Sequence, residues 1–277
     1  MASWRGHLAL HYRRDGERTI AHDRHHGPLR VLQRLYPEGP AICHHVLVHP
    51  PGGIVGGDEL VIDATLDPGT HALVTTPGAT RFYRSAGASA TQSATLRLGE
   101  GARLEWLPLE TLAYDGCLAE SRLRLALAPG AQAMGWELLA LGLPAAGQAF
   151  ERGRYLQQLE LPGVWLERGL IDAADRQLLD SPLGWAGRRV LATLWFTTGD
   201  ALPEARRDRM LDAAREVVDA DPLRDFAGAT APHDRVLLLR VLAPRVEPAF
   251  ALLTQVRAAW RRTAWDLDAP PPRIWRT

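Results

Sequence analysis

The amino-acid sequence predicts a mainly β protein, a β-helical or stacked-sheet scaffold with about two α-helices in its C-terminal third. Three observations support this fold class. Strand-like alternation dominates up to about residue 200, short glycine-containing turns recur at nearly regular intervals, and helical periodicity is confined to the residues beyond 200. We therefore expect a single domain over residues 1–277, β-rich over 1–200 and helix-containing over 201–277.

The clearest strand signal lies in residues 121–127, where Leu123, Leu125 and Leu127 alternate with arginine or alanine. A period of two places the leucines on one face of a pleated strand and the polar residues on the other. Residues 235–241 alternate in the same way, although more loosely. Both segments are typical of half-buried strands.

A weak internal repeat accompanies the strands. Gly69, Gly101, Gly130 and Gly163 each follow a leucine two or three residues earlier, and their spacings are 32, 29 and 33 residues. A regular spacing near 30 predicts supersecondary units that stack on one another. Turns that merely recur in an ordinary β protein would give the same short motif, so both readings stay open at this level.

Two helices are expected near the C-terminus. Residues 204–220 carry a stripe at helical spacing, and residues 248–262 carry a second one. The stripes consist of Met210, Leu211, Ala214, Val217 and Val218 in the first segment and Phe250, Leu253, Val256 and Trp260 in the second. The prolines of the tail, residues 269–277, exclude a helix there. We expect this tail to be extended and docked through Ile274 and Trp275.

The composition restricts the function classes. Of 277 residues, 46% are apolar, and the 32 basic residues, all arginine, balance 32 acidic ones. This balance argues against nucleic acid or an acidic membrane as the main partner, since both require an uncompensated basic face. Two cysteines, Cys43 and Cys117, make no disulfide framework, and we find neither a signal peptide nor an apolar run long enough to span a membrane. We expect a cytoplasmic protein.

The segment His49–Asp58, with the sequence HPPGGIVGGD, is the densest unusual motif. Its glycines permit positive φ and close backbone approach, so the loop can form an anion nest or a tight protein contact. No lysine follows it, the next residues are strand-like, and the spacing is not that of a dinucleotide site. Nucleotide binding is therefore not expected.

Metal-ligating residue types are present but scattered. His22, His25 and His26 form one group, and a second group contains Cys43, His44, His45 and His49. Neither shows the spacing of a closed tetrahedral site. More informative are four acids embedded among large apolar residues: Glu105, Glu110, Asp115 and Glu137. A buried carboxylate is costly unless it is paired, coordinated or protonated, so these acids indicate either strands that turn them to solvent or a water-filled interior.

Motifs for nucleophilic catalysis are not found. There is no GxSxG elbow, and Cys117 and Ser85 have no base at a recognised spacing. A pair of carboxylates from residues 104–117 could still act in a β-helical hydrolase. This enzyme class is the alternative to a binding protein.

Several blocks resemble the urease accessory protein D family (UreD, also called UreH). They are HPPGGIVGGD (49–58), TPGATRFYRS (76–85), LEWLP (104–108), WELLALG (136–142) and PRIWRT (272–277). The blocks run in the same order from near the start to the last residue, so the resemblance covers essentially the whole chain.

The resemblance implies a β-helical scaffold, not an enzyme, that binds urease accessory protein F and, through it, the GTPase UreG. This assembly docks on apo-urease and helps deliver nickel, for which an internal tunnel is proposed in the family. No cofactor is implied to bind tightly, since nickel only passes. Asp58, Glu105 and Glu137 fall in matched blocks and become candidates for the nickel path. Glu110 and Asp115, where the sequence departs from the family pattern, rank below them.

The resemblance also suggests residues for partner contacts or for shaping the glycine loop. They are His49, Gly52, Gly53, Gly56, Gly57, Arg81, Tyr83 and Trp275. A structural adaptor without metal passage would share these features. Nine tryptophans suggest apolar partner surfaces, so we expect low solubility when the protein is produced alone.

Overall fold

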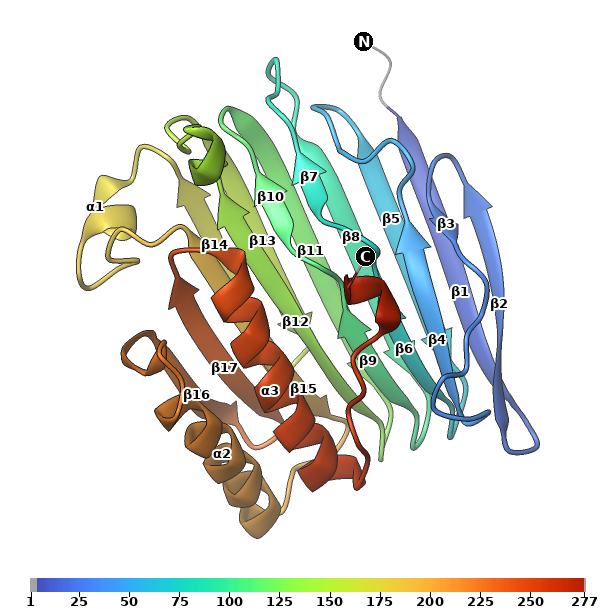
Figure 1. Cartoon of the computed structure of the whole chain (residues 1–277). Coiled ribbons are helices and arrows are strands. Elements are labelled where there is room, and N and C mark those ends of the chain that lie inside the picture. Colours follow the sequence, from blue (N-terminus) through green and yellow to red (C-terminus); the bar gives the residue numbers. More distant parts are fainter. Residues whose placement is uncertain (1–3, 277) are drawn as a thin grey trace.

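Two face-to-face sheets and one layer of helices make up the computed structural model, which describes residues 4–276 (Figure 1). The outer sheet contains, in spatial order, β14 (Trp165–Asp172), β13 (Gly153–Leu161), β11 (Cys117–Leu127), β8 (Ala90–Leu98), β5 (Glu59–Leu66), β1 (Arg5–Asp15) and β2 (Arg18–His26).

The middle sheet lies between the outer sheet and the helices. Its strands, in spatial order, are β16 (Ala227–His233), β17 (Val236–Ala243), β15 (Val190–Thr198), β12 (Gln132–Leu141), β9 (Arg103–Leu107), β6 (His71–Thr75), β4 (Ile42–Val48) and β3 (Arg30–Val31). The short strand β10 (Thr111–Ala113) pairs with β12 and with β7 (Thr80–Phe82).

From β4 to β13 the chain alternates between the two sheets and pairs in parallel within each of them. This is the path of a β-helix, and it confirms the predicted stacked-sheet fold. The coils are in register: Leu66 pairs with Leu98, and Leu98 pairs with Leu127. These are the leucines of the repeated turn motif, so the weak sequence repeat marks one corner of successive coils.

The turn glycines confirm the stacking. Gly69, Gly101 and Gly130 each connect an outer strand to a middle strand with φ between 63° and 70°, a region that other residues seldom adopt. The Gly69 amide donates to the carbonyl of Glu100 in the next turn (2.9 Å). Gly163 has the same conformation but closes a hairpin, because β14 returns antiparallel beside β13.

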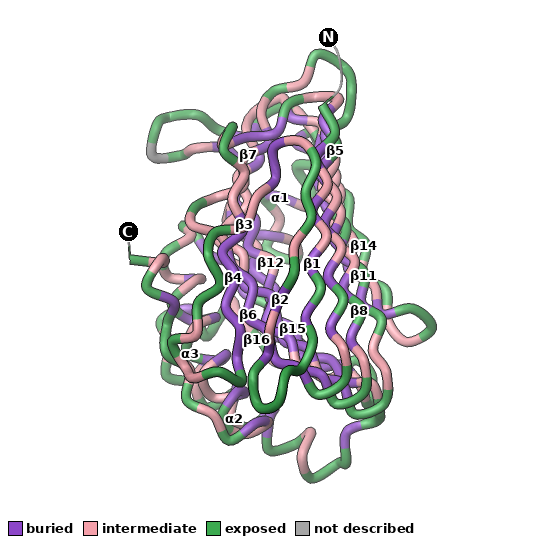
Figure 2. Tube along the Cα trace, turned by 90° about the vertical axis from the view of Figure 1, so that its right-hand side faces the viewer, coloured by how far each residue is buried: buried purple, intermediate pink, exposed green. Residues whose placement is uncertain are grey.

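The middle sheet is covered on both faces. On β12, Leu139 and Leu141 join the core between the sheets, whereas Met134, Trp136 and Leu138 join a second core beneath the helices. A strand buried on both faces reads as a nearly continuous apolar run, as residues 133–141 do apart from Glu137. The outer sheet has a free face, which explains the strict alternation in β11. Figure 2 shows the buried residues concentrated between the layers.

The helical layer contains α2 (Glu204–Asp219) and α3 (Val246–Trp265), which confirms both expected helices. Three features differ from expectation. A one-turn helix, α1 (Arg176–Asp180), was too short to show periodicity, and β16 lies within the predicted helix-containing part, next to β17, which confirms the strand predicted over residues 235–241. The tail is not extended throughout, because Arg273–Arg276 form a 3₁₀ turn in which the Trp275 amide donates to Pro272. Prolines 270–272 block a helix through themselves but not a turn after them.

In residues 4–276 we find no helix with both the length and the apolar character needed to cross a bilayer.

Candidate functional site: a polar layer between the sheets

The glycine-rich loop is fixed against β7. Ile54 bridges to Phe82, its amide donates to the carbonyl of Arg81 (2.7 Å), and the Tyr83 amide donates back to Ile54 (2.9 Å). Gly53 has to be glycine, since a Cβ there would lie 2.0 Å from the Tyr83 ring. Close approach of loop and strand, and not phosphate binding, is therefore the structural use of this glycine.

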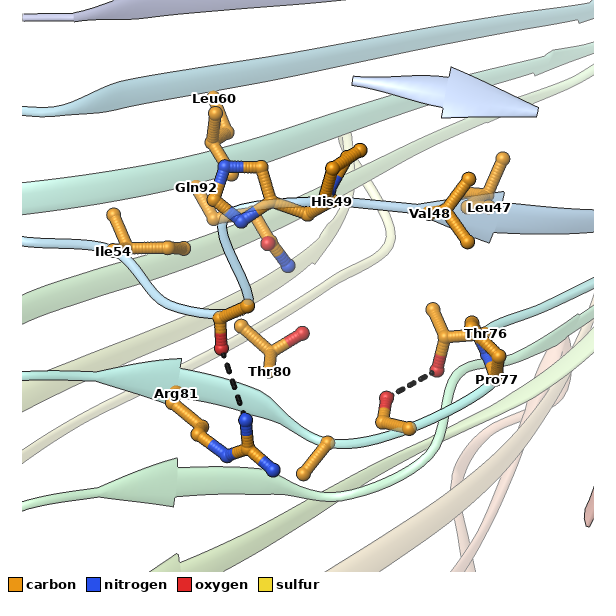
Figure 3. A pocket seen from close by; sticks show the side chains of 14 residues that line it. Leu47, Val48, His49, Ile54, Leu60, Thr76, Pro77, Thr80, Arg81 and Gln92 are labelled. Atoms are coloured by element: carbon orange, nitrogen blue, oxygen red, sulfur yellow. Dashed lines mark hydrogen bonds between the residues drawn. The ribbon is translucent and has the colours of Figure 1, made fainter. Parts of the chain in front are cut away.

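A pocket of about 470 Å³ opens beside this loop (Figure 3). Its lining includes His49 of the loop, Thr80 and Arg81 of β7, and Gln92 of β8. The Arg81 guanidinium donates to the Gly52 carbonyl (3.4 Å) and so holds the loop at the rim. Burial lowers the pKa of His49, although the charge of Asp58 partly opposes this, so the imidazole is neutral and able to bind a metal ion at neutral pH.

Polar side chains continue inward from this pocket. Gln92, Ser121 and Gln157 project between the sheets from β8, β11 and β13 at one level, because Gln92 is in register with Ser121 and Ser121 with Gln157. The inward positions on either side of this row are fully buried, whereas Gln92 and Gln157 are only half-buried. Of the three, Gln92 also lines the loop pocket, so this end of the row borders open space.

The middle sheet contributes a matching row. Glu137 of β12 is in register with Thr193 of β15, which is in register with Arg240 of β17. The Gln157 side chain is hydrogen-bonded to the Glu137 carboxyl group and so connects the two rows. Gln92, Ser121, Gln157, Glu137, Thr193 and Arg240 together form what we name the polar layer. It runs from the loop pocket to the opposite side of the sandwich, where Arg240 pairs with Glu167 of β14.

Glu137 is chemically distinctive within the polar layer. Burial raises its pKa to about 7, and the hydrogen bond from Gln157 offsets this only in part. No salt bridge to Glu137 is found among residues 4–276. A carboxyl group with this pKa exchanges its proton near neutral pH, so its charge can be formed when a cation is present and removed when it leaves.

Glu105 lies on the other face of the middle sheet, beneath α3. Its carboxylate contacts the fully buried Arg257 (2.7 Å) and Arg261 (3.5 Å), and His71 lies 3.7 Å away. Burial alone would raise its pKa, but Arg257, His71 and Arg261 lower it to about 2. The structure therefore does not bring Glu105 together with Glu137, and two arginines neutralise the charge that a nickel ion would require.

The other three predicted acids lie apart from the polar layer. Asp58 accepts hydrogen bonds from the amides of Val55 (3.1 Å) and Trp4 (3.3 Å) and shapes the loop. Asp115 accepts from the amides of Glu151 and Arg152 and pairs with the Arg152 side chain (2.8 Å). Glu110 lines a different pocket, of about 770 Å³, at the start of α3.

Trp275 lines that second pocket as well. Its ring packs against Trp136 and Phe250, with centroids 5.4 and 5.2 Å apart, and its indole N–H donates to the Thr75 hydroxyl (2.8 Å). The expected docking of the tail through Trp275 is thus confirmed. The indole is half-buried and fastens the C-terminus to the middle sheet.

Neither cysteine offers a ready nucleophile. Cys43 and Cys117 are free and buried, and burial raises the pKa of Cys117 to about 12, so it is a thiol at neutral pH. Across the described part of the chain, no three histidine, cysteine or acidic side chains are grouped to hold a metal ion.

Sequence reasoning missed Gln92, Ser121 and Gln157, because uncharged polar residues in strands carry no motif. A signal was nevertheless present: Gln92 and Ser121 each precede a turn glycine, Gly101 or Gly130, by nine residues. Equivalent positions in successive coils face the same way.

The fold and the polar layer define a class: a β-helical protein with a row of polar side chains between its two sheets. The chain belongs to the UreD urease accessory protein family, whose family model matches residues 5–276. It is 67% identical to the urease accessory protein UreD of Leptothrix cholodnii over 99% of this chain and all of that protein. The UreD of Verminephrobacter eiseniae is 62% identical over 98% and 99% of the two chains, and that of Paracidovorax citrulli 59% identical over 99% of both.

Proposed function

We propose that this protein is a non-catalytic, cytoplasmic scaffold of urease maturation that joins accessory protein F, and through it UreG, to apo-urease and passes nickel through its interior. The polar layer is the observation that supports this proposal most directly. It extends from a surface pocket to the opposite side of the sandwich through a core that is mainly apolar. A single-domain β protein has no folding need for such a layer, because buried polar groups cost stability.

The chemistry of the layer suits a passing divalent cation. His49 supplies a neutral imidazole at the pocket, Gln92, Ser121 and Gln157 supply uncharged oxygen atoms, and Glu137 supplies a carboxylate. Oxygen ligands bind nickel more weakly than a cluster of thiolates or imidazoles does. Weak, successive ligands allow an ion to move on, which a carrier requires.

Glu105 has a different part in this proposal. Its two arginine partners make it a structural ion pair that holds α3 on the middle sheet. We therefore place the nickel path along Glu137 and leave Glu105 outside it. The β-helical hydrolase alternative needs two carboxyl groups about 5–9.5 Å apart across a substrate site. Glu137 lies beside Gln157 and Thr193 in the polar layer. The next carboxylate along the layer, Glu167, forms an ion pair with Arg240, so it is not free to act together with Glu137.

The test uses apo-urease, accessory proteins F and G, GTP and nickel, with this protein either wild-type or variant. Gln157→Leu places an apolar side chain in the layer, and its matched control, Gln158→Leu, changes the neighbouring residue on the outer face of β13. A third variant, Glu137→Gln, removes the carboxylate from the layer. We expect Gln157→Leu and Gln158→Leu to assemble with accessory protein F. Of the three variants, only Gln157→Leu and Glu137→Gln should reduce the nickel content of urease several-fold. Normal nickel loading by both of these variants would support the adaptor without metal passage.

A further inference from the structure

We propose that the outer face of β14 and its neighbours is a docking surface for a protein partner that presents a carboxylate among apolar side chains. We name it the β14 patch: Leu118, Leu156, Leu166, Arg168 and Leu170. It rests on the proposed function in one respect, since the partner is taken to be a component of the urease assembly.

Two of the four leucines of the β14 patch are unusually exposed, and the other two are half-buried. Leu166 and Leu170 retain 59% and 55% of their accessible surface, on a strand at the edge of the outer sheet. Leu170 is in register with Leu156, and a hollow of about 510 Å³ lies between Leu118, Leu156 and Leu170. Contiguous exposed apolar side chains around a hollow mark interaction sites.

The charge of Arg168 indicates what kind of partner fits the β14 patch. Three arginines on the outward face of β11 and β13 have acidic neighbours: Arg122 pairs with Glu120, Arg124 with Glu160 and Arg154 with Asp172. Arg168, at the centre of β14 between the two exposed leucines, has no ion pair or hydrogen bond with any of residues 4–276. The hollow is also lined by Glu120 and Arg154, but each of these already has an ion-pair partner, so Arg168 is the unmatched charge beside the exposed leucines. A carboxylate is its complement, and arginine in such a setting is a frequent binding hot spot.

The β14 patch lies next to the end of the polar layer. The opposite face of β14 carries Glu167, which pairs with Arg240 at the end of the polar layer. Arg240 belongs to β17 of the middle sheet, so this ion pair joins the two sheets at the side where the layer ends. A partner seated on β14 lies directly beside the place where a cation would leave the polar layer.

A second copy of this chain is a poorer fit. Arg168 lies at the middle of β14, so a two-fold pairing about the centre of this strand brings two unmatched arginines close together. Like charges in an apolar contact are unfavourable. The chemistry therefore favours a different protein with an acidic residue at the contact.

The experiment measures binding of apo-urease and of accessory protein F to the full-length protein, each by titration at two salt concentrations. We expect Arg168→Glu to weaken binding of one of these two proteins about tenfold or more and to leave the other unchanged. Arg124→Glu is the matched control, since it changes an exposed arginine on the same face that already has a partner, Glu160, and neither residue lines the hollow. Leu166→Ser with Leu170→Ser should act as Arg168→Glu does, whereas Leu183→Ser, at a fully exposed leucine elsewhere, should not.

Equal binding of wild-type and Arg168→Glu protein to both probes would overturn the β14 patch. So would loss of self-association, seen by light scattering, as the only effect of the substitution. Circular dichroism and a thermal melt of each variant show whether the fold is intact, and an unfolded Arg168→Glu is replaced by Arg168→Gln. If the wild-type protein binds neither probe, the proposed function itself fails, which is a different result.

Discussion

Glu105 and Glu137 project from opposite faces of the middle sheet, although they lie on paired strands only a few residues apart in register. Glu105 pairs with Met134 of β12, and Glu137 follows three residues later. The odd separation turns the two carboxyl groups in opposite directions. One meets two arginines, and its pKa falls to about 2; the other meets Gln157, and its pKa rises to about 7. Of these two glutamates, Glu105 is thus a permanent anion on one face of the sheet, and Glu137 is an acid that can exchange its proton on the other.

Loss of the Glu105 charge is expected to destabilise the fold. Glu105→Gln leaves the fully buried Arg257 without its counterion and leaves Arg261, also fully buried, with Glu38 alone. Breaking a buried ion pair from one side costs roughly 3–5 kcal/mol. Urea unfolding should show this loss in the free energy of unfolding. Glu160→Gln, which removes an exposed partner of Arg124 at 3.8 Å, should cost less than about 1 kcal/mol. Similar losses in the two variants would contradict the structural role of Glu105.

The raised pKa of Glu137 predicts a pH-dependent stability. The folded protein holds this proton more tightly than the unfolded chain does, so the contribution of Glu137 to stability is complete below pH 4.5 and is lost as the pH rises through about 7. Because the Glu137 side chain is half-buried and not fully enclosed, we place the effect at roughly 1–3 kcal/mol. The difference in unfolding free energy between wild-type and Glu137→Gln, measured at pH 5 and pH 8, should change by this amount. A difference that is constant with pH would show that burial does not perturb Glu137.

The sequence predicted the parts of this fold that depend on local pattern. Alternation in β11 and the stripes of α2 and α3 reflect single elements, and the turn glycines mark one corner of the coils. The sheet faces on which the two acids lie could also have been predicted from the turn glycines, since Glu105 lies four residues after Gly101 and Glu137 lies seven residues after Gly130. An even and an odd count place side chains on opposite faces of a strand.

The remaining features depend on contacts between segments far apart in the chain. Arg257 and Glu105 are separated by 152 residues, and no spacing rule connects a helix arginine to a strand acid. The row from Gln92 to Gln157 forms only through the register of three strands. Asp115 seemed a possible ligand because acids in apolar sequence look buried, and Asp58 because it closes the glycine-rich block, but backbone amides of neighbouring residues occupy their oxygen atoms.

Trp275 is expected to stabilise the C-terminus. Trp275→Ala removes ring contacts with Trp136 and Phe250 and leaves the Thr75 hydroxyl without its donor. For a half-buried indole we expect a loss of about 2 kcal/mol, below the range for a fully buried tryptophan. The melting temperature should fall, whereas Leu183→Ala, at a fully exposed leucine, should leave it unchanged. An unaltered melt for Trp275→Ala would mean that the tail is held by other residues.

Gly53 and Tyr83 are expected to be energetically coupled. A methyl group at position 53 would meet the Tyr83 ring at 2.0 Å, so Gly53→Ala must displace either the ring or the loop. Overpacking of this kind costs about 1–3 kcal/mol. Tyr83→Ala alone loses the edge-to-face contact with Tyr114 but makes room for the methyl group. The double variant should therefore be more stable than the sum of the two single losses predicts.

Gly78→Ala is the control for Gly53→Ala, because a Cβ at Gly78 meets nothing within 4 Å and its backbone has no positive φ. We expect this change to alter stability by less than about 0.5 kcal/mol. Additive losses in the Gly53/Tyr83 cycle would show that the loop relaxes away from β7. In that case the loop at the rim of the His49 pocket can shift, and its shape depends less on Gly53 than on the hydrogen bonds of Ile54 with Arg81 and Tyr83.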